Sequence, residues 1–103
     1  MSNIDFTPLF NEINRILNIK VSMSIDLSGR KPQIICPNLV DHSGIFKAVF
    51  SEVTVDFFGY GKTDNGFWGT INVFYKHITG GSNGATLVNV WHNSSTQEWT
   101  FKN

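Results

Sequence analysis

The second half of the chain alternates between apolar and polar positions in a way that predicts β-strands joined by short polar turns. The predicted strands cover residues 53–57, 67–78, 85–92 and 98–102. Asn65-Gly66 is the strongest turn dipeptide between them, because both residues tolerate a positive φ; the predicted turns cover residues 59–66, 79–84 and 93–97. Connections this short join antiparallel neighbours, so residues 53–101 predict an antiparallel meander.

The first half opens with the pattern of an amphipathic helix. Thr7 is expected to be its N-cap and Pro8 its first helical residue, where the missing N–H costs nothing. The apolar stripe consists of Leu9, Phe10, Ile13, Ile16 and Leu17. Asn18 is expected to end the helix in a left-handed conformation. A helix of about three turns is marginal alone, so its stripe is expected to dock on the sheet or, alternatively, into another chain.

Two further strands are predicted before the meander. Residues 19–27 alternate without interruption, which predicts a strand with one buried face. Residues 33–36 form a short apolar segment between Pro32 and Pro37. Because proline cannot donate to a β-ladder, this strand is expected at a sheet edge, followed by a loop over residues 37–44.

Residues 45–51 fit both a helical stripe and a strand face. Their β-branched and aromatic content favours a strand. The apolar positions are even-numbered up to Phe50 and odd-numbered from Val53 onward. In a regular strand this change would turn the later apolar side chains to the opposite face. The sequence therefore predicts a β-bulge or bend near Ser51-Glu52.

Together these elements predict a single α+β domain over residues 1–103, in which an N-terminal amphipathic helix packs on a curved antiparallel sheet of five to six strands. The order of a helix followed by a meander is similar to the cystatin-like and NTF2-like cone architectures. The resemblance is one of shape, and shape alone implies no function.

Charge and composition narrow the classes of partner. Eight basic residues balance eight acidic ones, which argues against binding to a nucleic-acid backbone. Only 16% of residues are charged while 14% are aromatic, a low-charge surface that often has a partner. Cys36 is the only cysteine, and residues 1–5 lack a basic segment followed by an apolar one. With no apolar run near the ~18 residues of a membrane span, we expect a cytoplasmic protein without a membrane segment.

Titratable side chains give little indication of chemistry. Asp41-His42-Ser43 contains three types found in catalytic triads, but consecutive side chains point apart. His77 and His92 are expected not to meet, and no group of residues has metal-ligand spacing. The Gly-rich turns lack a phosphate-binding pattern. We expect no catalytic set, no metal and no cofactor, and a non-enzymatic role is favoured.

Asp56 is the acid with the best alternative interpretation. It is expected on the sheet face opposite the core. In a cone-shaped fold it would line a pocket in which burial raises its pKa for general-base work, with Tyr75 and His92 as companions. The simpler interpretation is that Asp56 points to water.

Aromatic residues supply the sharpest hypothesis, because they occupy both faces of the predicted meander. The residues expected to form a binding surface are Trp68, Asn72, Phe74, Trp91 and Trp99. In this register Trp91 lies opposite Trp99, and Phe57 is expected to cover the gap left by Gly69. One short helix covers only one face, and a second face rich in tryptophan and poor in charge resembles a binding surface. Alternatively, the sheet folds over, or cross-strand aromatic pairs only stabilise it.

The sequence therefore favours a small protein-binding module, such as an inhibitor, an immunity-type protein or an adaptor. Its sheet face would bind a protein partner or a second copy in a homodimer. The first alternative is a small-ligand-binding cone, or an enzyme, that uses the Asp56 pocket. The second alternative is a glycan-binding domain, because exposed tryptophan with asparagine and aspartate also holds sugars.

Overall fold

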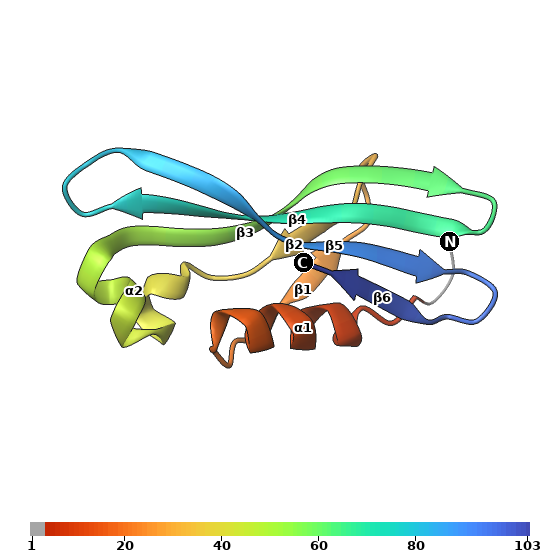
Figure 1. Cartoon of the computed structure of the whole chain (residues 1–103), viewed down its shortest axis with the longest axis horizontal. Helices are drawn as coiled ribbons and strands as arrows, with labels where there is room; N and C mark the ends of the chain where they lie inside the picture. The colour runs from red at the N-terminus through yellow and green to blue at the C-terminus, as the bar shows by residue number, and fades with distance from the viewer. Residues whose placement is uncertain (1–3) are drawn as a thin grey trace.

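The computed structural model describes residues 4–103 and contains two antiparallel sheets with the helices on one side (Figure 1). In chain order the elements are α1 (Thr7–Leu17), β1 (Ser24–Asp26), β2 (Gln33–Ile35), the short 3-10 helix η1 (Leu39–His42), α2 (Gly44–Val49), β3 (Phe50–Thr63), β4 (Gly66–His77), β5 (Ser82–Asn93) and β6 (Trp99–Lys102). Strands β3-β4-β5-β6 form the predicted meander, while β1 and β2 form a separate two-stranded hairpin. The α+β class is thus confirmed, but the single sheet of five to six strands is divided into two.

Helix α1 forms where the sequence predicts it, with a different start. Thr7 is the first helical residue and not the N-cap, and the Asp5 side chain accepts its backbone N–H at 3.0 Å. Asn18 ends the helix in the left-handed region at φ 55°, as expected. The apolar stripe faces the sheet, and its centre, Leu9 and Ile13, is completely buried.

The long strand predicted over residues 19–27 is wrong for its first half. Only β1 pairs with β2, and residues 19–23 lack a strand partner. The alternation still buries Ile19 and Val21 on one side. The Asn14 side chain replaces the missing partner, because its amide donates to Val21 O and accepts from Val21 N, both at 3.0 Å.

The strand predicted over residues 45–51 is also wrong, because residues 44–49 form helix α2. Ser43 caps this helix: its Oγ accepts the N–H of Phe46 at 3.3 Å. The helix ends as β3 begins at Phe50. The predicted bulge near Ser51-Glu52 is confirmed by a register shift between Phe50 and Glu52.

Strand β3 then continues through residues 59–63, which the sequence assigned to a turn. A second register shift between Phe57 and Gly59 leaves Phe58 without a partner on β4. A third shift lies between Ile71 and Asn72 of β4 and leaves Leu87 of β5 unpaired. These bulges increase the twist of the long strands.

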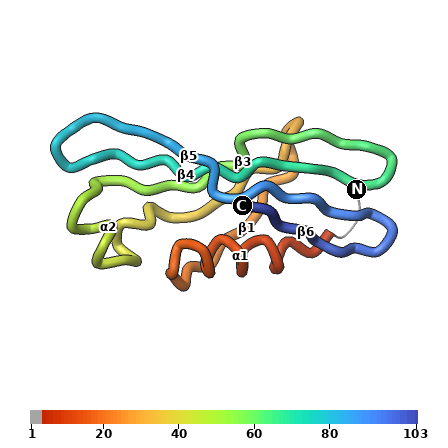
Figure 2. The backbone as a smooth tube through the Cα atoms, in the orientation of Figure 1, coloured from red at the N-terminus to blue at the C-terminus, as the bar shows by residue number. Residues whose placement is uncertain are grey.

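The core lies between one face of the four-stranded sheet, the covered face, and the elements that pack on it. Figure 2 shows α1 running along this face, with α2 beneath one end of the sheet. The buried side chains of the covered face include Val53, Val55, Phe57, Phe67, Ile71, Val73, Val88 and Val90. Phe57 lies over Gly69, as predicted, because a Cβ on Gly69 would come closer than 3.0 Å to its ring.

Candidate functional site

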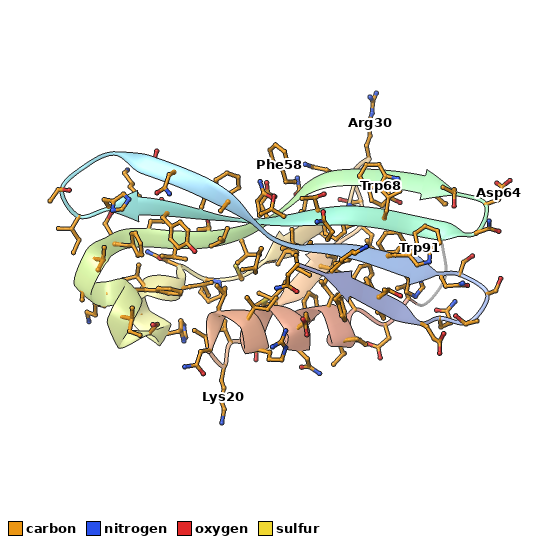
Figure 3. All side chains as sticks on the ribbon, in the orientation of Figure 1. Lys20, Arg30, Phe58, Asp64, Trp68 and Trp91 are labelled. Atoms are coloured by element: carbon orange, nitrogen blue, oxygen red, sulfur yellow. The ribbon has the colours of Figure 1, made fainter. Side chains whose placement is uncertain are left out.

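The opposite face of the sheet, the open face, carries large apolar side chains that none of the described helices covers. Its apolar residues are Phe58, Trp68, Phe74 and Trp91, and its polar residues include Asp56, Thr70, Asn72, Asn89 and Lys102. Figure 3 shows Phe58, Trp68 and Trp91 on the side of the sheet that points away from α1. The exposed fractions are 58% for Phe58, 47% for Trp68 and 37% for Phe74. These values show that the face is open to solvent.

Two of these rings lie on glycines of the neighbouring strand. Trp68 covers Gly61 of β3: three atoms of its indole are each nearer than 3.0 Å to the position of an added Cβ. Phe74 covers Gly84 of β5 in the same way, at 2.7 Å. A ring seated on a glycine lies low on the sheet and presents its other side outward. Trp68 and Phe74 therefore form low, flat parts of the open face, which we call the platform.

Polar side chains lie between the rings. Trp68 and Trp91 are cross-strand partners, and the next pair along the strands, Thr70 and Asn89, is joined by a side-chain hydrogen bond of 3.1 Å. Asn72 lies near the centre, opposite Asp56 on β3. Its Oδ1 is enclosed and has no hydrogen-bond partner among residues 4–103. An enclosed amide oxygen of this kind normally has a partner, and its enclosure keeps it out of reach of a donor bound on this face.

Trp99 does not belong to this face, and its predicted pairing with Trp91 is wrong. Trp91 pairs with Thr100, whereas Trp99 pairs with His92 on the covered face. The indole of Trp99 packs against the rings of Phe6 at 5.3 Å and His92 at 4.6 Å between centroids. Its Nε1 donates to Asp5 O at 3.0 Å, so Trp99 fastens the start of the chain to β6.

The alternative pocket of Asp56, Tyr75 and His92 does not form. Asp56 lies on the open face, while the other two side chains lie on the covered face. His92 pairs with Phe67, which is eight residues from Tyr75 along β4, a separation of about 26 Å. The three side chains therefore never converge on one substrate.

His92 is a buried histidine with an unusual environment. Its ring is stacked on Phe67 at 5.3 Å, and neither ring nitrogen has a hydrogen-bond partner among the described residues. Burial lowers its pKa, because the charged imidazolium is poorly solvated there. A hollow of about 250 Å³ lies beside it, which is smaller than the ~300–1,000 Å³ typical of ligand pockets. Because both nitrogens are enclosed, the ring supports packing in this position.

Phe58 is the residue of the open face that the sequence did not identify. In the sequence it is one of two consecutive phenylalanines, and adjacent strand residues normally point to opposite faces. Phe57 is completely buried, so its neighbour is directed outward. The Phe57-Phe58 dipeptide therefore contained the relevant pattern, but the strand was predicted to end at Phe57.

Metal-binding groups and membrane-spanning helices are absent from the described part of the chain. Within residues 4–103, no three histidine, cysteine, aspartate or glutamate side chains are grouped so that they could hold a metal ion. No helix in this part of the chain has the length and apolar character needed to cross a membrane. No protein-family model, curated protein or solved structure matches the chain.

Proposed function

We propose that this chain is a non-enzymatic protein-binding module that binds its partner on the open face of the four-stranded sheet. The observation that carries the proposal is the exposure of Phe58 and Trp68 on a face against which no helix of residues 4–103 packs. Large apolar side chains gathered on one exposed face often mark an interaction surface.

The composition of the open face supports a protein partner. Four large aromatic side chains lie on this face. The charged residues that register places there are Asp56, Lys102 on the edge strand β6, and Glu52 and Lys76 beyond Phe74. The centres of protein interfaces are likewise enriched in aromatic side chains. Thr70, Asn72 and Asn89 would supply the hydrogen bonds that fix the orientation of the partner.

Trp68 is the expected energetic centre of the interface. Tryptophans in the middle of an interface are frequent hot spots, whose truncation costs about 2 kcal/mol or more of binding free energy. The seat on Gly61 holds the indole flat before the partner arrives. Less side-chain entropy is therefore lost on binding than for a ring that moves freely in solvent.

The single free thiol of Cys36 suits a reducing compartment, and we place the module in the cytoplasm.

The test is capture of partners from the native host with immobilised wild-type protein and variants. Trp68→Ala is expected to reduce capture of the specific partner by about 30-fold, the equivalent of about 2 kcal/mol. The matched control is Ile45→Ala on α2, because Ile45 is 76% exposed but lies away from the open face. Quantitative mass spectrometry of the captured proteins and circular dichroism of each variant provide the measurements.

The expected pattern is that Trp68→Ala loses the partner and stays folded, while Ile45→Ala retains it. Equal capture by wild type and Trp68→Ala would show that the open face does not bind the partner. Unfolding of Trp68→Ala would contradict the exposed position of the ring.

The flat seating of Trp68 also favours a second candidate function, glycan binding. A sugar ring presents a flat apolar face that packs on an indole, while its hydroxyls bond to polar neighbours such as Thr70 and Asn89. Titration calorimetry with a panel of neutral oligosaccharides distinguishes the two candidates. Saturable binding of an oligosaccharide that is lost in Trp68→Ala would favour glycan binding. No detectable heat with any oligosaccharide of the panel would favour the protein partner.

A further inference from the structure

Strand β5 has a free edge. Its outer side is paired with β6 only from Asn89 to His92. The preceding segment, Ser82 to Thr86, which we call the β5 edge, pairs with β4 on its inner side, and no strand of residues 4–103 lies on its outer side. All five of its residues are exposed. Figure 1 shows this part of β5 as the outermost strand of an arm that extends away from α1.

The backbone groups that face outward follow from the ladder. His77 N–H donates to Gly81 O at 3.0 Å, which fixes these residues as a hydrogen-bonded pair. Hydrogen-bonded pairs alternate with non-bonded pairs in an antiparallel ladder. Pairs 76/82, 74/84 and 72/86 are therefore non-bonded. The N–H and C=O groups of Ser82, Gly84 and Thr86 consequently point outward, while those of Asn83 and Ala85 bond to β4.

The other edge of the sheet, along β3, is protected at several points. The Asn38 amide accepts the N–H of Val53 at 3.0 Å and donates to Ser51 O at 3.1 Å, as a neighbouring strand would. Lys31 Nζ donates to Phe58 O at 3.1 Å. The bulges of β3 also interrupt this edge. These are the devices by which natural sheets prevent an additional strand from joining.

The β5 edge has none of these devices. Residues 82–89 contain no proline and no charged side chain, and the bulge at Leu87 lies beyond the segment. We infer that a second copy of this chain pairs with the β5 edge, antiparallel and across a two-fold axis, so that two four-stranded sheets become one continuous sheet. This inference concerns the edge of the sheet and is independent of what binds the open face.

The edge is complementary to itself. With the two-fold axis at Gly84, the outward groups of Ser82 meet those of Thr86 in the second copy, and the two Gly84 residues meet each other. Every outward donor on one copy then faces an outward acceptor on the other. Because the segment carries no charge, the two copies approach without like-charge repulsion. Two-fold symmetry is also the commonest arrangement of protein oligomers.

The pairing would join the two open faces. The axis of such a ladder is perpendicular to the sheet, so both open faces lie on the same side. Phe74 already covers Gly84 from β4. The dimer therefore places two Phe74 rings beside the axis and continues each platform into the other. Pairing through this one short strand buries less than the ~1,200 Å² of a typical stable interface, so we expect a dimer that forms at high micromolar concentration.

Analytical ultracentrifugation from about 20 µM to about 1 mM measures the association. Thr86→Pro removes an outward N–H and leaves the bonds between β4 and β5 intact. It is expected to raise the dissociation constant at least tenfold. Thr86→Val keeps the N–H and the β-branched shape, and is expected to dimerise like wild type. A wild-type protein that stays monomeric at the highest concentration, or a Thr86→Pro variant that dimerises equally well, would overturn the inference.

Amide hydrogen exchange gives a second readout on the wild-type protein, which decides the question even if Thr86→Pro fails to fold. The N–H groups of Ser82, Gly84 and Thr86 are expected to exchange rapidly in dilute solution and at least tenfold more slowly in concentrated solution. Those of Asn83 and Ala85 are expected to be protected at both concentrations. Protection that increases elsewhere but not at Ser82, Gly84 and Thr86 would overturn the inference. Protection confined to residues around Trp68 would mean that the copies associate through the open face.

Discussion

The exposure of one sheet face can be tested by placing the same small change on each side of the sheet. Gly61 and Gly69 lie on neighbouring strands, and each is covered by an aromatic ring. Trp68 covers Gly61 on the open face, whereas Phe57 covers Gly69 on the covered face. An alanine at either position would bring its Cβ closer than 3.0 Å to the covering ring. Neither glycine has a positive φ, so alanine strains neither backbone.

The two substitutions are expected to differ because only one of the rings can move away. Trp68 is 47% exposed and can rotate into solvent, so we expect Gly61→Ala to cost less than about 1 kcal/mol of unfolding free energy. Phe57 is completely enclosed, so the added methyl of Gly69→Ala overfills a packed core, at a cost of about 1–3 kcal/mol. The entropy that alanine removes from the unfolded chain is the same at both positions and cancels in the comparison.

Urea unfolding followed by circular dichroism measures both free energies, and thermal unfolding provides a check. For a chain of this size, a difference of 1 kcal/mol corresponds to a shift of about 4–8 °C in Tm. Equal destabilisation by the two substitutions would mean that Trp68 is as confined as Phe57. The open face would then be covered in solution, and the proposed binding surface would lose its basis.

Two further predictions concern polar side chains that hold or perturb the fold. Asn38→Ala removes the side-chain hydrogen bonds to the edge of β3 and is expected to lower the unfolding free energy by about 1–3 kcal/mol in a urea titration. The control is Asn11→Ala on the exposed side of α1, which should change the unfolding free energy by less than about 0.5 kcal/mol. Burial in the folded state lowers the pKa of His92, so the unfolded chain binds more protons at this residue than the folded chain does. The free energy of unfolding should therefore fall as the pH drops below about 6.5, by at most about 1.4 kcal/mol per pH unit. His92→Phe should remove this slope between about pH 5 and pH 7; an unchanged slope would assign the pH dependence to another group.

Features that depend on neighbouring residues in the chain could be predicted from the sequence. The stripe of α1, its left-handed end at Asn18 and the bulge after Phe50 follow from periodicity and from residues with a strong conformational preference. The sequence also predicts that Phe57 covers Gly69, because a glycine within a strand leaves a gap for a neighbouring ring. The order of the strands in the meander follows from their short connections.

Features that depend on long-range packing could not be predicted in the same way. The segment that forms α2 suits a helix and a strand equally well, and the Ser43 cap together with the contact of Phe46 with Tyr75 favours the helix. The register of β6 depends on how its turn closes. Asn93 N–H donates to Glu98 O at 2.9 Å, which pairs Trp99 with His92 and turns its indole to the covered face. A shift of one residue in this turn would move Trp99 from the covered face to the open face.

The two unsatisfied surfaces of the molecule have a common physical origin. Strands β3, β4 and β5 are long, whereas the elements available to cover them are α1, a short hairpin and the short helices η1 and α2. The helices lie on the covered face, and the tip of the β1–β2 hairpin, with Arg30, extends past β3 toward the side of Phe58 (Figure 3). The covered face takes all of this packing, and the edge of β3 takes the polar contacts of Asn38 and Lys31. Within residues 4–103, no helix packs on the open face and no strand pairs with the β5 edge. Because Phe74 lies over Gly84, these two surfaces meet at one place, so pairing of two copies would enlarge the platform without occupying it.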